Sequence, residues 1–170
     1  NLNVSFYGIG AIKENELYTS SPLEANIIEV QNPKFSSASY IISPSGNGTY
    51  KLSEGPLKGN KDKFQFGQLV SLPFGKVIIK IKKGKKSFEP IKIVFRSTPS
   101  LVSSLESQLV VALPPDKGQM MDISFTGPVP SKSEDILNSL TEQYNNEGKK
   151  DRNMEAQNTQ DFINGRLEII

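Results

Sequence analysis

Residues 128–170 read PVPSKSEDILNSLTEQYNNEGKKDRNMEAQNTQDFINGRLEII, and their pattern is that of one long helix. Ser131 with Glu134 fits a capping box, which marks a helix start. Apolar residues recur at helical spacing in the first turns, at Ile136, Leu137, Leu140 and Tyr144. We therefore predict a helix from about residue 131 that is still running at Ile170, where no closing Gly, Asn or Pro follows.

A polar middle, from residue 145 to residue 161, interrupts the apolar pattern of this helix. An apolar helix face packs on the protein, whereas a polar helix meets solvent or another subunit. The helix is predicted to dock on a sheet through a core of four residues, Ile136, Leu137, Leu140 and Tyr144. Its polar middle is predicted to face solvent or a neighbouring subunit, with three candidate subunit contacts, Asn145, Asn153 and Asn158.

The first three-fifths of the chain is strand-like. In KVIIKIKK (76–83) apolar residues alternate with lysines, which is typical of a strand with one buried and one solvated face. ASYIIS (38–43) and GTYKLSE (48–54) flank the turn-forming cluster PSGNG (44–48), so we predict a hairpin there.

The pattern changes near Pro99, which suits the first position of a helix. LVSSLESQL (101–109) has helical spacing, and VVAL (110–113) and MMDISF (120–125) flank a turn and predict a second hairpin. We predict an α+β fold. Residues 1–98 form an antiparallel β-rich lobe, and residues 99–170 form a smaller α/β part with the long C-terminal helix.

Composition excludes several kinds of chemistry within these residues. The chain has 170 residues and contains neither Cys nor His. Ser–His triads, Cys–His dyads, ordinary zinc sites and disulfides are therefore impossible here. No apolar run approaches the roughly 18 residues needed to cross a bilayer. Because no nucleophile, base and orienting group come together, we expect no catalytic, cofactor-binding or metal-binding residue in this chain.

The positive charge is concentrated in one region. Residues 51–96 hold 12 of the 20 Lys and Arg residues but only three of the 18 acids. The simplest interpretation is a solvated strand face. The run is also a candidate contact for an acidic glycan or lipid head groups, through Lys76, Lys80, Lys82 and Lys83. Nucleic acid is not expected as a partner, because the run lacks arginine and interleaved aromatic residues.

The C-terminal segment resembles the bacterial polysaccharide chain-length determinant family, also called polysaccharide co-polymerases. It is most similar to the branch fused to a tyrosine autokinase. The matching positions are residues 122–130, Ile136-Leu137-Asn138, Tyr144-Asn145, Asn158-Thr159, Phe162-Ile163 and Arg166-Leu167. SFYGIGAIKENELYTSSPLEA (5–25) and FGQLVSLPFGKVIIKI (66–81) also resemble the β-rich periplasmic region of that branch.

The resemblance implies a periplasmic scaffold of a bacterial inner-membrane protein, with transmembrane helices on either side of these residues. It implies self-association into a ring, together with the polysaccharide polymerase and export machinery as partners. Such proteins set the length or enable the export of capsule, exopolysaccharide or lipopolysaccharide. ATP and Mg²⁺ enter only if a tyrosine-protein kinase domain exists elsewhere in the full protein. We accordingly expect this chain to be an internal piece of a longer protein.

Two other interpretations remain open. One is a carbohydrate- or surface-binding β-module of a secreted protein, which the lysine run would serve. The other is an accessory domain of an ATP-using enzyme.

Overall fold

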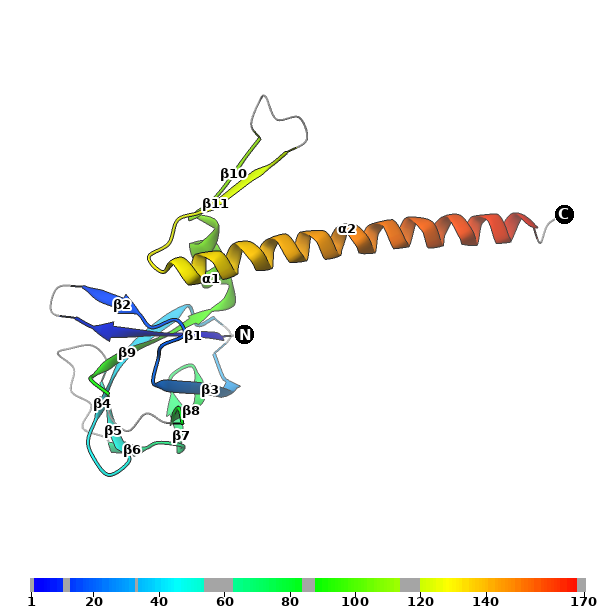
Figure 1. The fold of residues 1–170 in the computed structure, drawn as a ribbon. Coiled ribbons are helices and arrows are strands. Elements are labelled where there is room, and N and C mark those ends of the chain that lie inside the picture. Colours follow the sequence, from blue (N-terminus) through cyan, green and yellow to red (C-terminus); the bar gives the residue numbers. More distant parts are fainter. Residues whose placement is uncertain are drawn as a thin grey trace. The chain divides into compact units, whose positions relative to one another are not determined.

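The computed structural model describes residues 2–10, 13–32, 34–53, 63–83, 88–113 and 120–167, with side chains as far as residue 164. The expected α+β class is confirmed, because antiparallel sheets are combined with a long C-terminal helix (Figure 1). Contacts divide the chain into two units, Asn1–Gln108 and Leu109–Ile170.

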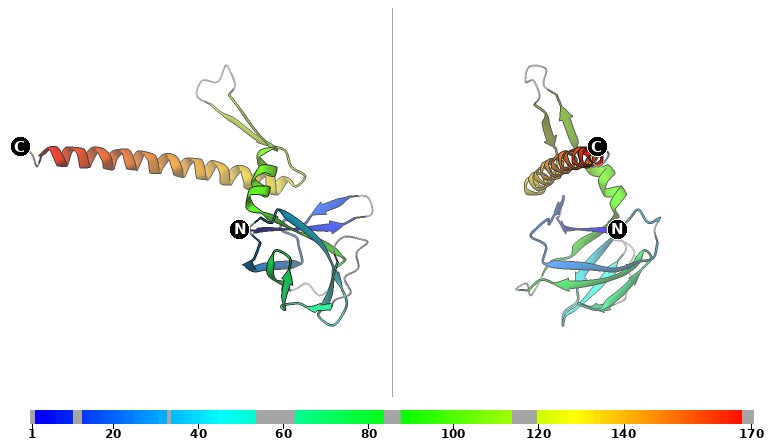
Figure 2. Two further views of the ribbon diagram at one scale, coloured as in Figure 1. Left: turned by 180° about the vertical axis from the view of Figure 1, so that it is seen from behind. Right: turned by 90° about the vertical axis from the view of Figure 1, so that its right-hand side faces the viewer.

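The first unit contains two antiparallel sheets among the described residues. One sheet is built from β1 (Leu2–Ile9), β2 (Glu14–Glu16), β4 (Ser37–Pro44), β5 (Thr49–Ser53), β6 (Lys63–Gln65) and β9 (Ile91–Ser97). Its strand order is β2-β1-β9-β4-β5-β6. The other is built from β3 (Leu23–Val30), β7 (Leu69–Leu72) and β8 (Gly75–Ile81), in the order β3-β8-β7. The two sheets face each other in both views of Figure 2.

The core of this unit lies between the two sheets. Val77 and Ile79 on β8 are fully buried, while Lys80, the next residue along the strand, is exposed, as the alternating pattern predicts. From the opposite sheet, Ile93 and Phe95 on β9 enter the same cluster. Burial of alternate residues on both inner faces is the arrangement that stabilises a two-layer β fold.

The predicted hairpin at residues 38–54 is confirmed. β4 pairs with β5, with Ile42 opposite Leu52. The connecting loop is closed by a hydrogen bond from Ser45 N to Thr49 O, 2.9 Å long. Gly46 and Gly48 have positive φ angles of 76° and 72°, a conformation that glycine adopts without steric cost.

Phe74 connects the two sheets from within a turn. β7 and β8 are joined by Pro73 and Phe74, because Leu72 pairs with Gly75. The Phe74 side chain is fully buried, and its ring centroid lies 4.5 Å from that of Phe35 and 4.7 Å from that of Phe95. Its carbonyl oxygen accepts a hydrogen bond of 2.9 Å from Gln31 N. A residue of the turn is thus part of the core.

Tyr50 on β5 carries a buried hydroxyl. The side chain is fully buried and packs against Phe66, with ring centroids 4.6 Å apart. Among the described residues, its hydroxyl oxygen has no hydrogen-bond partner. Burial raises the pKa of Tyr50 to about 12, because the phenolate would lose its hydration.

We expect the stability of the fold to fall with rising pH through Tyr50. The unfolded tyrosine releases its proton near pH 10 and the folded one near pH 12. The stability that depends on a neutral Tyr50 is therefore complete below pH 10 and is lost progressively between pH 10 and pH 12. Tyr50→Phe should be at least as stable at pH 7, because no hydrogen bond is lost. At pH 11.5 it should exceed the wild type by about 2 kcal/mol. Urea unfolding of both proteins at pH 7, 10 and 11.5 measures the difference in their free energies of unfolding. A difference that stays constant across these three pH values would contradict the prediction.

Helix α1 (Thr98–Glu106) belongs to the first unit. Ser97 caps it, since the Ser97 hydroxyl oxygen accepts a hydrogen bond of 3.3 Å from Ser100 N. The helix contacts β9 and β1, and the Asn3 side-chain amide donates to the Thr98 hydroxyl at 3.1 Å. The boundary between units therefore follows Gln108, whereas the sequence placed it at residue 98, because the helix packs back on the strand that precedes it.

The second unit contains the predicted second hairpin and the long helix. β10 (Leu109–Ala112) pairs with β11 (Asp122–Phe125), with Val110 opposite Ser124. α2 (Pro130–Leu167) has 38 residues and extends over roughly 57 Å at 1.5 Å per residue. It starts at Pro130, whose fixed φ suits the first helical position, one residue before the predicted capping residue. Among the described residues, no helix has both the length and the apolar character needed to cross a membrane.

Candidate functional site

The lysine run on β8 is less basic in the structure than in the sequence. β3 pairs with β8 so that Glu24 lies opposite Lys80 and Glu29 lies opposite Lys76. Lys76 Nζ lies 2.6 Å from the Glu29 carboxylate. Each of these two lysines therefore has an acid as its cross-strand neighbour, which the sequence alone did not reveal.

The ion pair between Lys76 and Glu29 has an electrostatic consequence. The hydrogen bond from Lys76 lowers the pKa of the Glu29 carboxyl below its usual value, and a hydrogen bond from Gln31 adds to this. Glu29 thus stays ionised beside the lysine over the whole neutral range. An anionic ligand at Lys76 would have to displace this carboxylate.

Lys82 and Lys83 follow β8 and are exposed. They remain accessible cations, although Lys85 and Lys86 of the same run lie outside the described residues. In the described part of the chain, Asp and Glu side chains form no group of three or more that could hold a metal ion.

The prediction of a four-residue docking core on α2 needs correction. Ile136 and Leu137 are half-buried, but the side chain of Leu140 is 38% exposed and that of Tyr144 is 71% exposed. α2 contacts β11, whose four residues span only about 13 Å at roughly 3.3 Å per residue. A strand of that length reaches the first turns of a long helix and no further. Helical periodicity indicated an apolar face but did not identify what covers it.

The rest of α2 is exposed to solvent as far as its side chains are described. The three candidate subunit contacts, Asn145, Asn153 and Asn158, are all exposed, as the polar pattern predicts. Their role as contacts stays a prediction. Large apolar side chains are exposed as well, namely Tyr144, Met154, Phe162 and Ile163. Within the described residues of the second unit, this helix therefore carries several large exposed apolar side chains.

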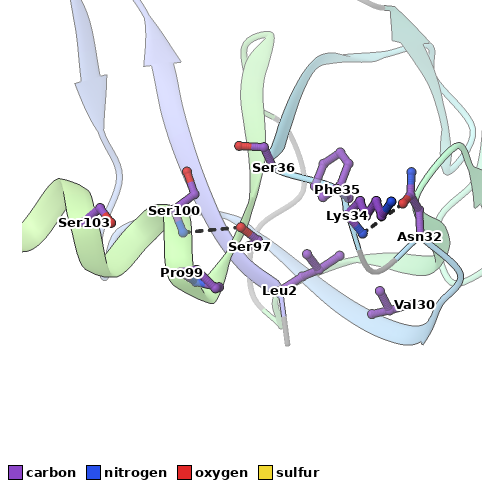
Figure 3. Close-up of a pocket in the computed structure, with 10 residues that line it drawn as sticks. All are labelled: Leu2, Val30, Asn32, Lys34, Phe35, Ser36, Ser97, Pro99, Ser100 and Ser103. Atoms are coloured by element: carbon purple, nitrogen blue, oxygen red, sulfur yellow. Dashed lines mark hydrogen bonds between the residues drawn. The ribbon is translucent and has the colours of Figure 1, made fainter.

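A groove that sequence reasoning missed lies in the first unit. It has a volume of about 810 Å³ and separates the described part of the β3–β4 connection from the start of α1 (Figure 3). Leu2, Val30, Phe35 and Pro99 form its apolar wall. Residues that far apart in the sequence are brought together by the pairing of β9 with both β1 and β4, so no local pattern announced the groove.

The walls of this groove are fixed by hydrogen bonds. Lys34 N donates to Asn32 Oδ1 at 3.0 Å, which holds the connection in a turn. Ser97 N donates to Ser36 O at 2.8 Å and ties the connection to the end of β9. Asn32 N also donates to the Phe74 carbonyl oxygen at 3.4 Å. Asn32, Lys34, Ser36, Ser97, Ser100 and Ser103 form the polar rim of the groove. On the side of the β3–β4 connection, this rim is held in place by the same turn that contributes Phe74 to the core.

No protein-family model matches the chain, and no curated protein matches it. The resemblance described above therefore depends on the residues of this chain alone.

Proposed function

We propose that this chain is the periplasmic scaffold region of a bacterial inner-membrane polysaccharide co-polymerase. In this role it regulates the length or export of capsule, exopolysaccharide or lipopolysaccharide. It works through shape and self-association, without chemistry of its own. Any tyrosine kinase activity of the full protein would belong to another domain.

The exposed apolar side chains of α2 are the observation that carries this proposal. At about 100° per residue, Leu140, Tyr144, Met154 and Phe162 fall within an arc roughly 80° wide. Their exposed fractions are 38%, 71%, 57% and 64%. We call these four residues the α2 stripe. Helices obtain most of their stability from packing an apolar face, so a helix with such a stripe is expected to have a partner.

The polar residues between the members of the α2 stripe suit a contact between subunits. Glu147, Asp151 and Asn158 fall within the same arc as the stripe. A buried helix core would exclude such groups unless they were paired, whereas interfaces between subunits combine apolar anchors with polar contacts. Lateral packing of subunits through α2 would build the ring that holds or measures the growing glycan.

The alternative of a secreted glycan-binding module receives less support. Its basic face depends on the lysines of β8, and two of these lie opposite Glu24 and Glu29. Lys80→Glu, Lys82→Glu and Lys83→Glu separate the two functions. A module would lose its binding to an acidic glycan in this triple variant, whereas a scaffold would show no glycan binding that depends on these three lysines and would be tested by polymer length in cells.

The proposed function is tested by placing charges on the α2 stripe of the full-length protein. Tyr144→Asp with Phe162→Asp should abolish the characteristic polymer length on gels, because burying an unpaired carboxylate in a subunit contact costs several kcal/mol. Asn146→Asp with Gln160→Asp adds the same charge away from the stripe and should leave polymer length unchanged. Immunoblots of membranes confirm equal protein levels. Wild-type polymer length in the stripe variant would overturn the proposal.

A further inference from the structure

The groove in the first unit combines apolar and polar walls in the way that a sugar requires. A pyranose has apolar C–H faces and hydroxyl edges. The Phe35 ring is half-buried, packs against Phe74 and also lines the groove, together with Leu2 and Pro99 (Figure 3). The volume of about 810 Å³ lies within the range of small-molecule sites.

The polar rim offers groups that are free to bind a ligand. Within the described residues, the hydroxyls of Ser36, Ser100 and Ser103 form no hydrogen bond, although all three line the groove. Asn32 uses its side-chain oxygen for the bond to Lys34 N, which leaves the amide NH₂ as a donor. Hydroxyl and amide groups of this kind match the edges of a sugar ring.

The charge of the rim defines the ligand more narrowly. Lys34 is exposed and lines the groove, and no acid does so among its described residues. In the described part of the chain, Lys34 forms no ion pair, unlike Lys76 and Lys92. A ligand with a carboxylate would therefore be favoured over a neutral one.

We propose that this groove binds a short segment of an acidic saccharide, with a uronate carboxylate at Lys34 and ring hydroxyls at Ser36 and Ser100. This inference rests on the proposed function and deepens it. The scaffold would then contact its polymer through the first unit, at a site separate from the α2 stripe. Because the contacts are exposed and polar, the site would bind one or a few residues weakly, as a guide for a moving polymer must.

The experiment titrates the ¹⁵N-labelled chain with trigalacturonic acid and follows backbone amide shifts. We expect saturable shifts that cluster at residues 32–36 and 97–103. Maltotriose, which lacks carboxylates, should bind more weakly. Monomeric galacturonic acid and acetate distinguish a saccharide site from a site for any carboxylate, and equal shifts with acetate would overturn the assignment to a saccharide.

Two variants locate the binding. Lys34→Ala should weaken trigalacturonate binding about fivefold, as expected for an exposed charge pair of up to 1 kcal/mol. Lys80→Ala, an exposed lysine on β8, should have no effect. Ser100→Phe should fill the groove and abolish the shifts, while an unchanged melting temperature shows that it folds.

Each outcome applies to one proposal. Absence of clustered shifts, or equal loss of binding in Lys34→Ala and Lys80→Ala, would overturn the groove proposal alone. The scaffold function would still be supported if the α2 stripe variant changed polymer length. If that variant left polymer length unaltered, the scaffold function would fail, and saccharide binding at the groove would then support a glycan-binding module.

Discussion

Phe74→Ala is expected to destabilise the first unit by about 3–5 kcal/mol, the usual cost of deleting a fully buried phenylalanine. The side chain is fully buried between Phe35 and Phe95, so its removal opens a cavity where the two sheets meet. Urea unfolding monitored by near-UV circular dichroism measures the loss. Because Phe35 lines the groove, the same variant should also weaken saccharide binding there.

Leu69→Ala is the matched control for Phe74→Ala. Leu69 lies on β7 of the same hairpin, but its side chain is 47% exposed. Its loss should cost less than about 1 kcal/mol, because little apolar area returns to water. If Phe74→Ala costs no more than the Leu69 variant, Phe74 does not connect the sheets.

Phe74 also shows what the sequence did not indicate. Leu72-Pro73-Phe74-Gly75 forms a turn between two strands, as its Pro and Gly residues favour. Turn chemistry depends on local backbone preferences, which residue types reveal. The burial of Phe74 depends on Phe35 and Phe95, which are distant in the sequence. No periodicity in a turn reports such a contact.

The strands and α2 were accessible from the sequence because their signals are local. Alternation of Val77 and Ile79 with lysines located β8, and helical spacing from Ile136 located α2. The exposure of Leu140 and Tyr144 was missed, because an apolar face looks the same whichever partner covers it. The acids opposite Lys76 and Lys80 were missed, because their position depends on the register between β3 and β8.

The groove was the least predictable feature. Its lining comes from the start of β1, the β3–β4 connection and α1. None of these segments carries a motif, and each serine has an ordinary role in a loop or helix start. Only the pairing of β9 with both β1 and β4 brings them together. Sites assembled from such unremarkable residues become visible in the three-dimensional arrangement alone.

Glu147→Pro should remove the function of α2 without touching the α2 stripe. Proline in a helix interior deletes a backbone hydrogen bond and clashes with the preceding turn, at a cost of about 3 kcal/mol or more. Glu147 lies in the polar middle of α2 and is exposed, so no packed contact is lost with its side chain. In the isolated chain, helical circular dichroism at 222 nm should fall, while the urea unfolding of the first unit stays unchanged.

In the full-length protein, the same substitution separates a mechanical role from a chemical one. A scaffold needs α2 as one continuous rod, because the residues of the α2 stripe on either side of Glu147 must meet a partner together. Glu147→Pro should therefore abolish the characteristic polymer length as completely as the stripe variant does. Glu147→Gln keeps both the helix and a polar side chain able to hydrogen-bond within the same arc, and should retain wild-type length. If the proline variant behaves like the glutamine variant, the two halves of α2 act independently, and a rigid subunit contact along the helix is not how this chain works.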